Sequence, residues 1–320
     1  MNPHRCIWIA CMSLMATTTV SAQTGPRLLL TPWAQDTQSE LEVDFTTLNR
    51  GHTDNRDARF HLRRHDVSGR WRQDPKANGS SLLAVGVDAS YLSLSTNDPV
   101  LPKRLVNQAV AAGFQLNQEG NLKLVLGLGY AGNNPYADAE ALYGQADLIY
   151  TKSLDSKSSL RVILSHNGRR VLFPDVPLPS VLYQRQHSET ISYGLGFPIN
   201  NVHWQVNDRL SVRALYVLPT TINLAVEYKF NDGWKAFGRF DNQLDAFTID
   251  RAQDHRRLFF QQRRIEAGIR MHSDQQIDLT LAAGYTFGQE FSTGHDVRDL
   301  DDIAEPSDEP YFRVAIDIRF

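Results

Sequence analysis

Apolar and polar residues alternate with a period of two along most of the chain. The alternation is clearest in three stretches, 122–130, 222–230 and 277–287, and weaker instances recur elsewhere. Successive side chains of a strand point to opposite faces, so this pattern predicts strands with one apolar and one polar face. No segment shows the 3.6-residue period of an amphipathic helix. The sequence therefore predicts an all-β protein.

The length of these stretches separates two kinds of β protein. Strands of a soluble sandwich usually have about five or six residues, whereas about ten residues match a tilted strand that crosses a membrane. Several stretches end in Tyr, Trp or Phe, where interfacial aromatic girdles lie. A closed ring leaves no unpaired strand edge in hydrocarbon. We therefore expect a transmembrane antiparallel up-and-down β-barrel of about 12–14 strands, in line with the even numbers of bacterial barrels.

The connections between the predicted strands differ in length. Tight turns are predicted at 207–208, 231–233 and 273–274, and longer connections around 250–256 and 288–310. Short turns on one side and long loops on the other are typical of outer-membrane barrels. The segment 167–186 contains three prolines and is interpreted as a loop.

The N-terminus has the features of a secretory signal peptide. Arg5 precedes a short apolar run, and the small residues Val20-Ser21-Ala22 follow. Cleavage between Ala22 and Gln23 would leave one domain, residues 23–320. Both cysteines would then be removed; a lipoprotein with Cys11 acylated is the alternative. The chain has 33 basic and 36 acidic residues, a balance that does not suggest nucleic-acid binding.

The last ten residues also alternate, with an apolar residue at every even position. Its apolar positions are Phe312, Val314, Ile316, Ile318 and Phe320. This stretch resembles the C-terminal assembly signal of Gram-negative outer-membrane barrels. The resemblance implies export to the bacterial outer membrane, recognition by the barrel-assembly machinery, and contact with outer-membrane lipid and lipopolysaccharide.

A second resemblance covers part of the C-terminal half. It is carried by Phe197-Pro-Ile-Asn-Asn-Val-His-Trp204, Asn207-Asp208, Leu218-Pro219, Tyr228 and Asn231-Asp-Gly-Trp234. These residues resemble a family of outer-membrane β-barrel proteins of unknown function. The resemblance implies the same architecture and brings no catalytic or binding residues with it.

Charged residues recur on the polar face of the C-terminal strands, where they would point into the barrel. They are Glu227, Lys229, Lys235, Arg239, Asp241, Asp245, Arg264, Glu266, Arg270, Asp278, Arg313, Asp317 and Arg319. In an aqueous pore such charges act as an electrostatic filter. The alternative is a set of ion pairs that fills the lumen, because an unpaired buried charge costs several kcal/mol.

Other clusters of polar residues are candidates for a site. The acidic segment 288–310, expected as an extracellular loop, could bind a divalent cation or simply be solvated. Ser165 and His166 could belong to a lipid hydrolase, but adjacent strand residues point to opposite faces. His61 and His65 form no metal-ligand pair. We expect four arginines to flank an exposed loop and touch lipopolysaccharide phosphate: Arg63, Arg64, Arg70 and Arg72.

These observations favour a passive channel or transporter for small polar solutes, with no cofactor and no metal. The alternative is a non-conducting structural or surface-interaction barrel with a charge-plugged lumen. A lipid-modifying outer-membrane enzyme is disfavoured, because no convincing catalytic group of residues is present. The identity of any solute is left open.

Overall fold

The computed structural model describes residues 29, 33, 37–54, 57–73, 83–117, 120–174, 176–249, 256–273 and 276–320. The expected signal segment 1–22 and the expected cleavage site after Ala22 lie outside these residues. The described part is almost entirely β-strand, with a 3-10 turn, η2, at Ala139–Ala141. Within it, no helix is both long and apolar enough to cross a membrane.

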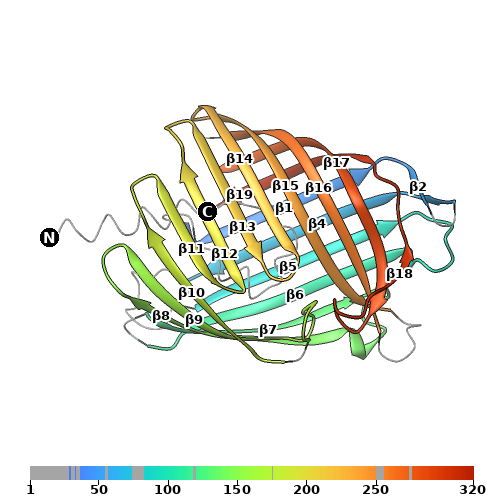
Figure 1. Cartoon of the computed structure of the whole chain (residues 1–320), viewed down its shortest axis with the longest axis horizontal. Coiled ribbons are helices and arrows are strands. Elements are labelled where there is room, and N and C mark those ends of the chain that lie inside the picture. The colour runs from blue at the N-terminus through green and yellow to red at the C-terminus, as the bar shows by residue number, and fades with distance from the viewer. Residues whose placement is uncertain are drawn as a thin grey trace.

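Sixteen strands of the described chain lie side by side in one ring (Figure 1). Around the ring they are β1 Ser39–Leu48, β4 Leu62–Arg72, β5 Leu83–Leu94, β6 Arg104–Gln115, β7 Leu122–Gly132, β8 Leu142–Ser153, β9 Ser158–Asn167, β10 Leu178–Gln186, β11 Ile191–Phe197, β12 Ile199–Gln205, β13 Leu210–Val217, β14 Thr221–Asn231, β15 Trp234–Thr248, β16 Arg257–Ser273, β17 Ile277–Gly294 and β19 Pro310–Arg319. Three short strands lie in the connections: β2 Gly51–Thr53, β3 Ala58–Phe60 and β18 Asp301–Ala304.

The first and last strands close the ring. β1 pairs with β19 on one edge, where Val43 lies opposite Ile316, and with β4 on its other edge. Neighbouring wall strands are antiparallel around the whole ring. Closure pairs the backbone groups that an open edge would leave without partners in hydrocarbon. The predicted antiparallel up-and-down β-barrel is therefore confirmed.

The described ring has sixteen strands, more than the 12 to 14 expected. One reason is that part of the segment read as a loop, 167–186, forms β10. Pro179 lies near the start of this strand, where 178–180 pair only with β9 and not yet with β11. A proline is tolerated at such a one-sided position because its missing N–H leaves no partner unpaired. The prediction of a loop at 167–186 was therefore wrong for β10, because proline does not exclude a strand at this position.

Apolar side chains face outward from strand to strand. Exposed examples are Leu41, Val43, Phe45, Val67, Val87, Val110, Leu128, Leu148, Leu164, Leu195, Leu224, Val226, Ile265, Leu281, Phe312, Val314 and Ile316. The residues between them are largely buried and often polar. Exposed apolar surface of this extent marks a contact with lipid or another apolar partner. The apolar positions of the alternating pattern therefore lie on the outer surface of the barrel.

The two ends of the barrel differ. At one end, here called the turn end, the predicted tight turns at 207–208 and 231–233 lie together with Ser273, which begins the third predicted turn, and with the C-terminus. Residue 274 of that turn lies outside the described residues. The carbonyl of Phe320 accepts hydrogen bonds at the turn end from the N–H groups of Gln38 at 2.8 Å and Ser39 at 3.1 Å. The opposite loop end contains η2, the β2–β3 hairpin and β18. The segment 288–310 is not one loop, because 288–294 continue β17 and 301–304 form β18.

Candidate functional site in the closed lumen

The charged residues expected in the lumen lie on the inner face of β14 to β17 and β19. Eight are buried: Arg239, Asp241, Asp245, Arg264, Glu266, Arg270, Asp278 and Arg313. Five are partly exposed: Glu227, Lys229, Lys235, Asp317 and Arg319. Lys229 lies at the turn end, where it pairs with Asp232 at 2.5 Å. Six of the others belong to one connected network: Arg239, Asp241, Asp245, Arg264, Glu266 and Arg313.

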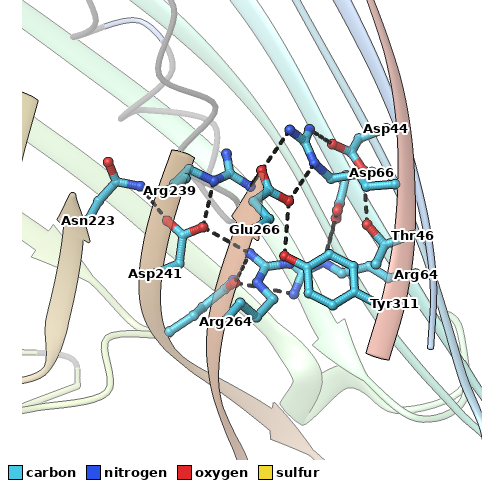
Figure 2. A network of polar contacts seen from close by, with 12 residues as sticks. Asp44, Thr46, Arg64, Asp66, Asn223, Arg239, Asp241, Arg264, Glu266 and Tyr311 are labelled. Carbon is cyan, nitrogen blue, oxygen red and sulfur yellow. Dashed lines mark hydrogen bonds and ion pairs between the residues drawn. The ribbon is translucent and has the colours of Figure 1, made fainter. Parts of the chain in front are cut away.

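Glu266 is the centre of that network (Figure 2). Arg313 donates to both of its carboxylate oxygens, from Nε at 3.1 Å and from Nη2 at 2.9 Å. The hydroxyl of Tyr311 donates to the same carboxylate at 2.9 Å, and Arg239 Nη2 lies 3.0 Å from it. Arg313 also reaches Asp44 of β1 at 2.6 Å. Charge-assisted, two-point bonds of this kind hold long side chains in fixed positions.

The network continues along β15. Arg239 Nε lies 2.7 Å from Asp241 Oδ2, and the amide of Asn223 on β14 donates to the other oxygen of Asp241. Arg264 lies 3.8 Å from Asp241 and donates to the side-chain oxygen of Gln243 at 3.4 Å. Acids and bases therefore alternate across neighbouring strands, which reduces the cost of their burial.

A second part of the network crosses the lumen. Arg64 on β4 donates to Asp66 at 2.8 Å and, from Nη1, to Asp245 on β15 at 3.4 Å. Arg169, which follows β9, donates to Asp245 at 3.5 Å and to the carbonyl of Ala246 at 2.9 Å. Since β4, β9 and β15 are distant in the ring, these contacts span the interior. Asp245 of β15 is thus hydrogen-bonded to residues from two distant parts of the wall, β4 and the segment after β9.

Further ion pairs lie on the inner face of neighbouring strands. Glu227 pairs with Arg213 and, at 3.3 Å, with Arg270. Asp278 pairs with Arg319 at 2.9 Å and lies 2.5 Å from Nδ1 of His272, and Arg70 pairs with Glu40 at 2.5 Å. The lumen wall therefore carries opposite charges in contact, rather than a field of one sign.

At the loop end the barrel is closed by three long strands. The parts of β15, β16 and β17 at 245–248, 257–261 and 290–294 are here called the cap. Thr248 of the cap pairs with Gly132 of β7, which lies eight strands away around the ring in either direction. Figure 1 shows β15 and β16 running towards the end of the barrel where β7 also ends. The cap therefore reaches the opposite wall.

The sequence of the cap fits this position. A wall strand buries every second residue, but Ala246 and Phe247 are both buried, as are Leu258, Phe259 and Phe260. Both faces of these strands are therefore covered by protein. The strands bend where their register shifts between Gln261 and Arg263, next to Gly288 with a positive φ of 56°. A β-bulge of this kind bends a sheet.

An apolar cluster lies under the cap. Phe260 stacks on Phe291 with ring centroids 4.4 Å apart, and Phe60 of β3 packs against Phe291 at 6.1 Å. The cluster also contains Leu48, Leu62, Leu92, Leu94, Leu101, Leu105, Ala131, Tyr143, Phe247, Leu258, Ala304 and Tyr311. Because its members come from strands on several sides of the ring, this cluster fills the lumen at the loop end.

A second apolar cluster lies on strands β5 to β9. Leu29 is 1% exposed and packs with Ala84, Ala111, Val125, Ile149 and Ile163, with Trp33 beside it. Lys123 donates to the carbonyl of Leu29 at 2.8 Å, and the guanidinium of Arg70 lies 4.2 Å from the ring centre of Trp33. Leu29 and Trp33 thus lie against the inner wall.

The other clusters named in the sequence analysis make different contacts. Ser165 Oγ accepts a hydrogen bond from Arg170 at 3.2 Å, and the ring of His65 packs 4.8 Å from Phe45. Arg298 donates to Asp296 in the segment after β17, and this hydrogen bond lowers the pKa of Asp296 to about 2. Among the described residues, no three His, Cys, Asp or Glu side chains are grouped as metal ligands.

The expectation for the N-terminal arginines was wrong. All four lie on β4 rather than beside an exposed loop. Arg64 and Arg70 are buried in ion pairs, whereas Arg63 is exposed. The alternation around Val67 carried the signal, because Arg64, Asp66 and Arg70 share the face opposite Val67. The cap had a signal as well, in the consecutive apolar residues 258–260.

No family model matches the sequence, and no curated protein matches it. Several solved outer-membrane barrels are similar. An outer membrane channel from Pseudomonas putida F1 is 12% identical, with 90% of this chain and 97% of that chain covered and a TM-score of 0.40. The Pseudomonas putida toluene transporter TodX is 9% identical, with 94% and 93% covered and a TM-score of 0.42. Outer membrane protein opdK from Pseudomonas aeruginosa is 10% identical, with 89% and 99% covered and a TM-score of 0.42.

Proposed function

We propose that this protein is an outer-membrane channel for small polar solutes that is closed at rest and opens when the cap moves. The observation that carries the proposal is the pairing of Thr248 with Gly132 across the ring. About eight strands suffice for a barrel filled by its own side chains, whereas about sixteen leave an aqueous channel. In this protein the sixteen-stranded wall is wide enough for a channel, and the cap closes it at one end. This arrangement favours a channel that can open to solutes over a barrel whose lumen is permanently filled.

We also propose that the protein lies in the bacterial outer membrane, in contact with its lipids and its assembly machinery. The exposed apolar belt supports contact with outer-membrane lipid, and the C-terminal pattern supports recognition by the barrel-assembly machinery. Lipopolysaccharide would contact the loop end. The proposal contains no catalytic step, since Ser165 is bonded to Arg170 and its neighbour His166 follows it directly on the strand.

The alternative function is a barrel that never conducts. The ion-pair network around Glu266 and the apolar cluster under the cap favour it, because both occupy the interior. The two functions differ in one respect: a channel opens when the contact between cap and wall is weakened, and a plugged barrel does not.

Gly132 offers a way to weaken that contact. A Cβ atom at this position would lie 2.9 Å from the hydroxyl oxygen of Tyr130, 3.1 Å from Ala141 Cβ and 3.2 Å from the carbonyl oxygen of Thr248. Gly132→Val should therefore push the cap away from β7. Gly144 is the matched control, because a Cβ there would meet nothing within 4 Å.

The test is single-channel conductance of the refolded proteins in planar bilayers. We expect rare openings for the wild type and for Gly144→Val, and at least about tenfold higher open occupancy for Gly132→Val, the effect of about 1.4 kcal/mol. If none of the three proteins opened, although a native heat-modifiable gel shift showed each to be folded, the non-conducting barrel would be favoured. A Gly132→Val protein that fails to insert is replaced by Gly132→Ala.

A further inference from the structure

The inner wall of β5, β6 and β8 holds a group of buried polar side chains that the ion-pair network does not use. Asp88, Ser90, Asn107 and Gln145 are 9%, 4%, 1% and 4% exposed. Five of their atoms have no hydrogen-bond partner within the described part of the chain: Asp88 Oδ2, Ser90 Oγ, Asn107 Nδ2, and both side-chain polar atoms of Gln145. A polar atom buried without a partner is unfavourable unless something else bonds to it.

The wall between these residues is made of small side chains. Ala109 and Ala111 of β6 lie opposite Gly129 and Gly127 of β7, and Gln145 of β8 lies opposite Gly127. Gly129 is needed beside Tyr143, since a Cβ there would lie 2.2 Å from Cζ of that ring. The hydroxyl of Tyr143 donates to Asn107 Oδ1 at 3.0 Å, which leaves the amide N–H groups of Asn107 as donors.

Ser90 of β5 lies directly opposite Asn107 of β6, whereas Gln145 of β8 is too far from Asp88 and Ser90 of β5 to bond to them. Neighbouring strands are about 4.8 Å apart, so β5 and β8 are separated by about 14 Å along the wall. The free groups comprise donors on Asn107 and Gln145, acceptors on Asp88 and Gln145, and the hydroxyl of Ser90, which can do either. A hydroxyl group on a ligand can likewise accept from an amide and donate to a carboxylate at once.

We propose that this wall is a binding site for a small neutral solute with several hydroxyl groups, of the polyol or monosaccharide class. An anion would use only the donors and would meet the carboxylate of Asp88. A cation would leave the amide N–H groups without acceptors. The proposal rests on the proposed function, because the solute must enter the lumen, and it names the class of solute that the channel takes.

Isosteric variants test the site. Gln145→Met and Asn107→Leu keep approximate side-chain shape and remove the free donors and acceptors. Gln262→Met is the matched control, because Gln262 is also a buried glutamine but is bonded to Gln289 at 2.8 Å. Binding of D-glucose, acetate and ethylammonium to the full-length protein in detergent is measured by saturation-transfer NMR and calorimetry. The same measurements on Gly132→Val allow for slow entry past the cap.

We expect D-glucose to bind more tightly than acetate and ethylammonium, and each site variant to weaken this binding about tenfold, as loss of one buried hydrogen bond would. Gln262→Met should bind as the wild type does. Equal binding of the three probes, unchanged binding in Gln145→Met, or no binding in either background would overturn the site. Proteoliposome swelling separates the two proposals. Flux without glucose preference would overturn the site alone, whereas glucose binding without flux would overturn the channel alone.

Discussion

Arg313 of β19 forms a two-point ion pair with Glu266 of β16, although β17 lies between their strands. The pair is possible because both side chains leave the wall and meet inside the barrel, where Glu266 also faces Arg239. Two guanidinium groups therefore share this carboxylate, and each has one further acid, Asp44 for Arg313 and Asp241 for Arg239. We expect removal of the Glu266 charge to have a larger effect than loss of a single exposed ion pair.

Glu266→Gln should destabilise the folded barrel by about 3 kcal/mol, because two buried arginines would lose their shared counter-charge. The measurement is the urea midpoint of unfolding in detergent, followed by the heat-modifiable gel shift. Glu189→Gln is the control, since Glu189 is exposed in the turn before β11. A midpoint for Glu266→Gln equal to that of the control would show that water inside the lumen already solvates these arginines.

The arginines of β15 and β16 should set ion selectivity once the cap is open. In the Gly132→Val background, replacement of Arg239 and Arg264 by Glu reverses the sign of two buried charges on the inner face. We expect a several-fold rise in preference for cations, because charged rings act as filters at short range. The reversal potential in a KCl gradient measures it. Unchanged selectivity would place the conducting path away from these side chains.

The contact between β17 and β18 should depend on pH. Glu290 lies beyond Tyr285, an outward apolar residue of β17, and therefore outside the membrane-crossing part. A hydrogen bond with Asp302, burial and the charge of Asp302 raise the pKa of Glu290 from 4.5 to about 7. Because the folded state holds the proton more tightly, this contact is most stable at low pH. Its stability falls as pH rises from 4.5 to about 7, and changes little above that.

Amide exchange of 290–304, corrected for the intrinsic rate, measures this dependence. We expect faster exchange at pH 8 than at pH 5 in the wild type, and little difference in Glu290→Gln, which cannot ionise. Glu189→Gln should keep the wild-type dependence. If Glu290→Gln kept it as well, another group would control the contact.

The period of two was enough to predict most of the strands, their faces and a closed ring, because lipid outside the barrel requires the same alternation in each strand, but it missed β4 and β10. It was not enough for the cap. There Leu258, Phe259 and Phe260 are all apolar because both faces of β16 are covered, and a short apolar run does not say by what. Similarly, the pairing of Arg64 with Asp245 depends on the curvature of the ring, which brings distant strands together and leaves no mark on local spacing.

Phe320 can be tested for two different roles at the end of β19. Its backbone extends the β1–β19 pairing through hydrogen bonds with Gln38 and Ser39, while its aromatic side chain is 66% exposed. Phe320→Ala keeps the backbone bonds and removes the ring, whereas deletion of the residue removes both. If the aromatic ring is the assembly signal, both variants should lower the amount of inserted protein to a similar extent, measured by heat-modifiable protein in isolated outer membranes. Phe230→Ala, at another exposed aromatic residue on β14, should insert normally. If Phe320→Ala inserted normally and the deletion did not, the backbone hydrogen bonds of Phe320 would be what matters for barrel closure. Recognition of its aromatic side chain would then be excluded.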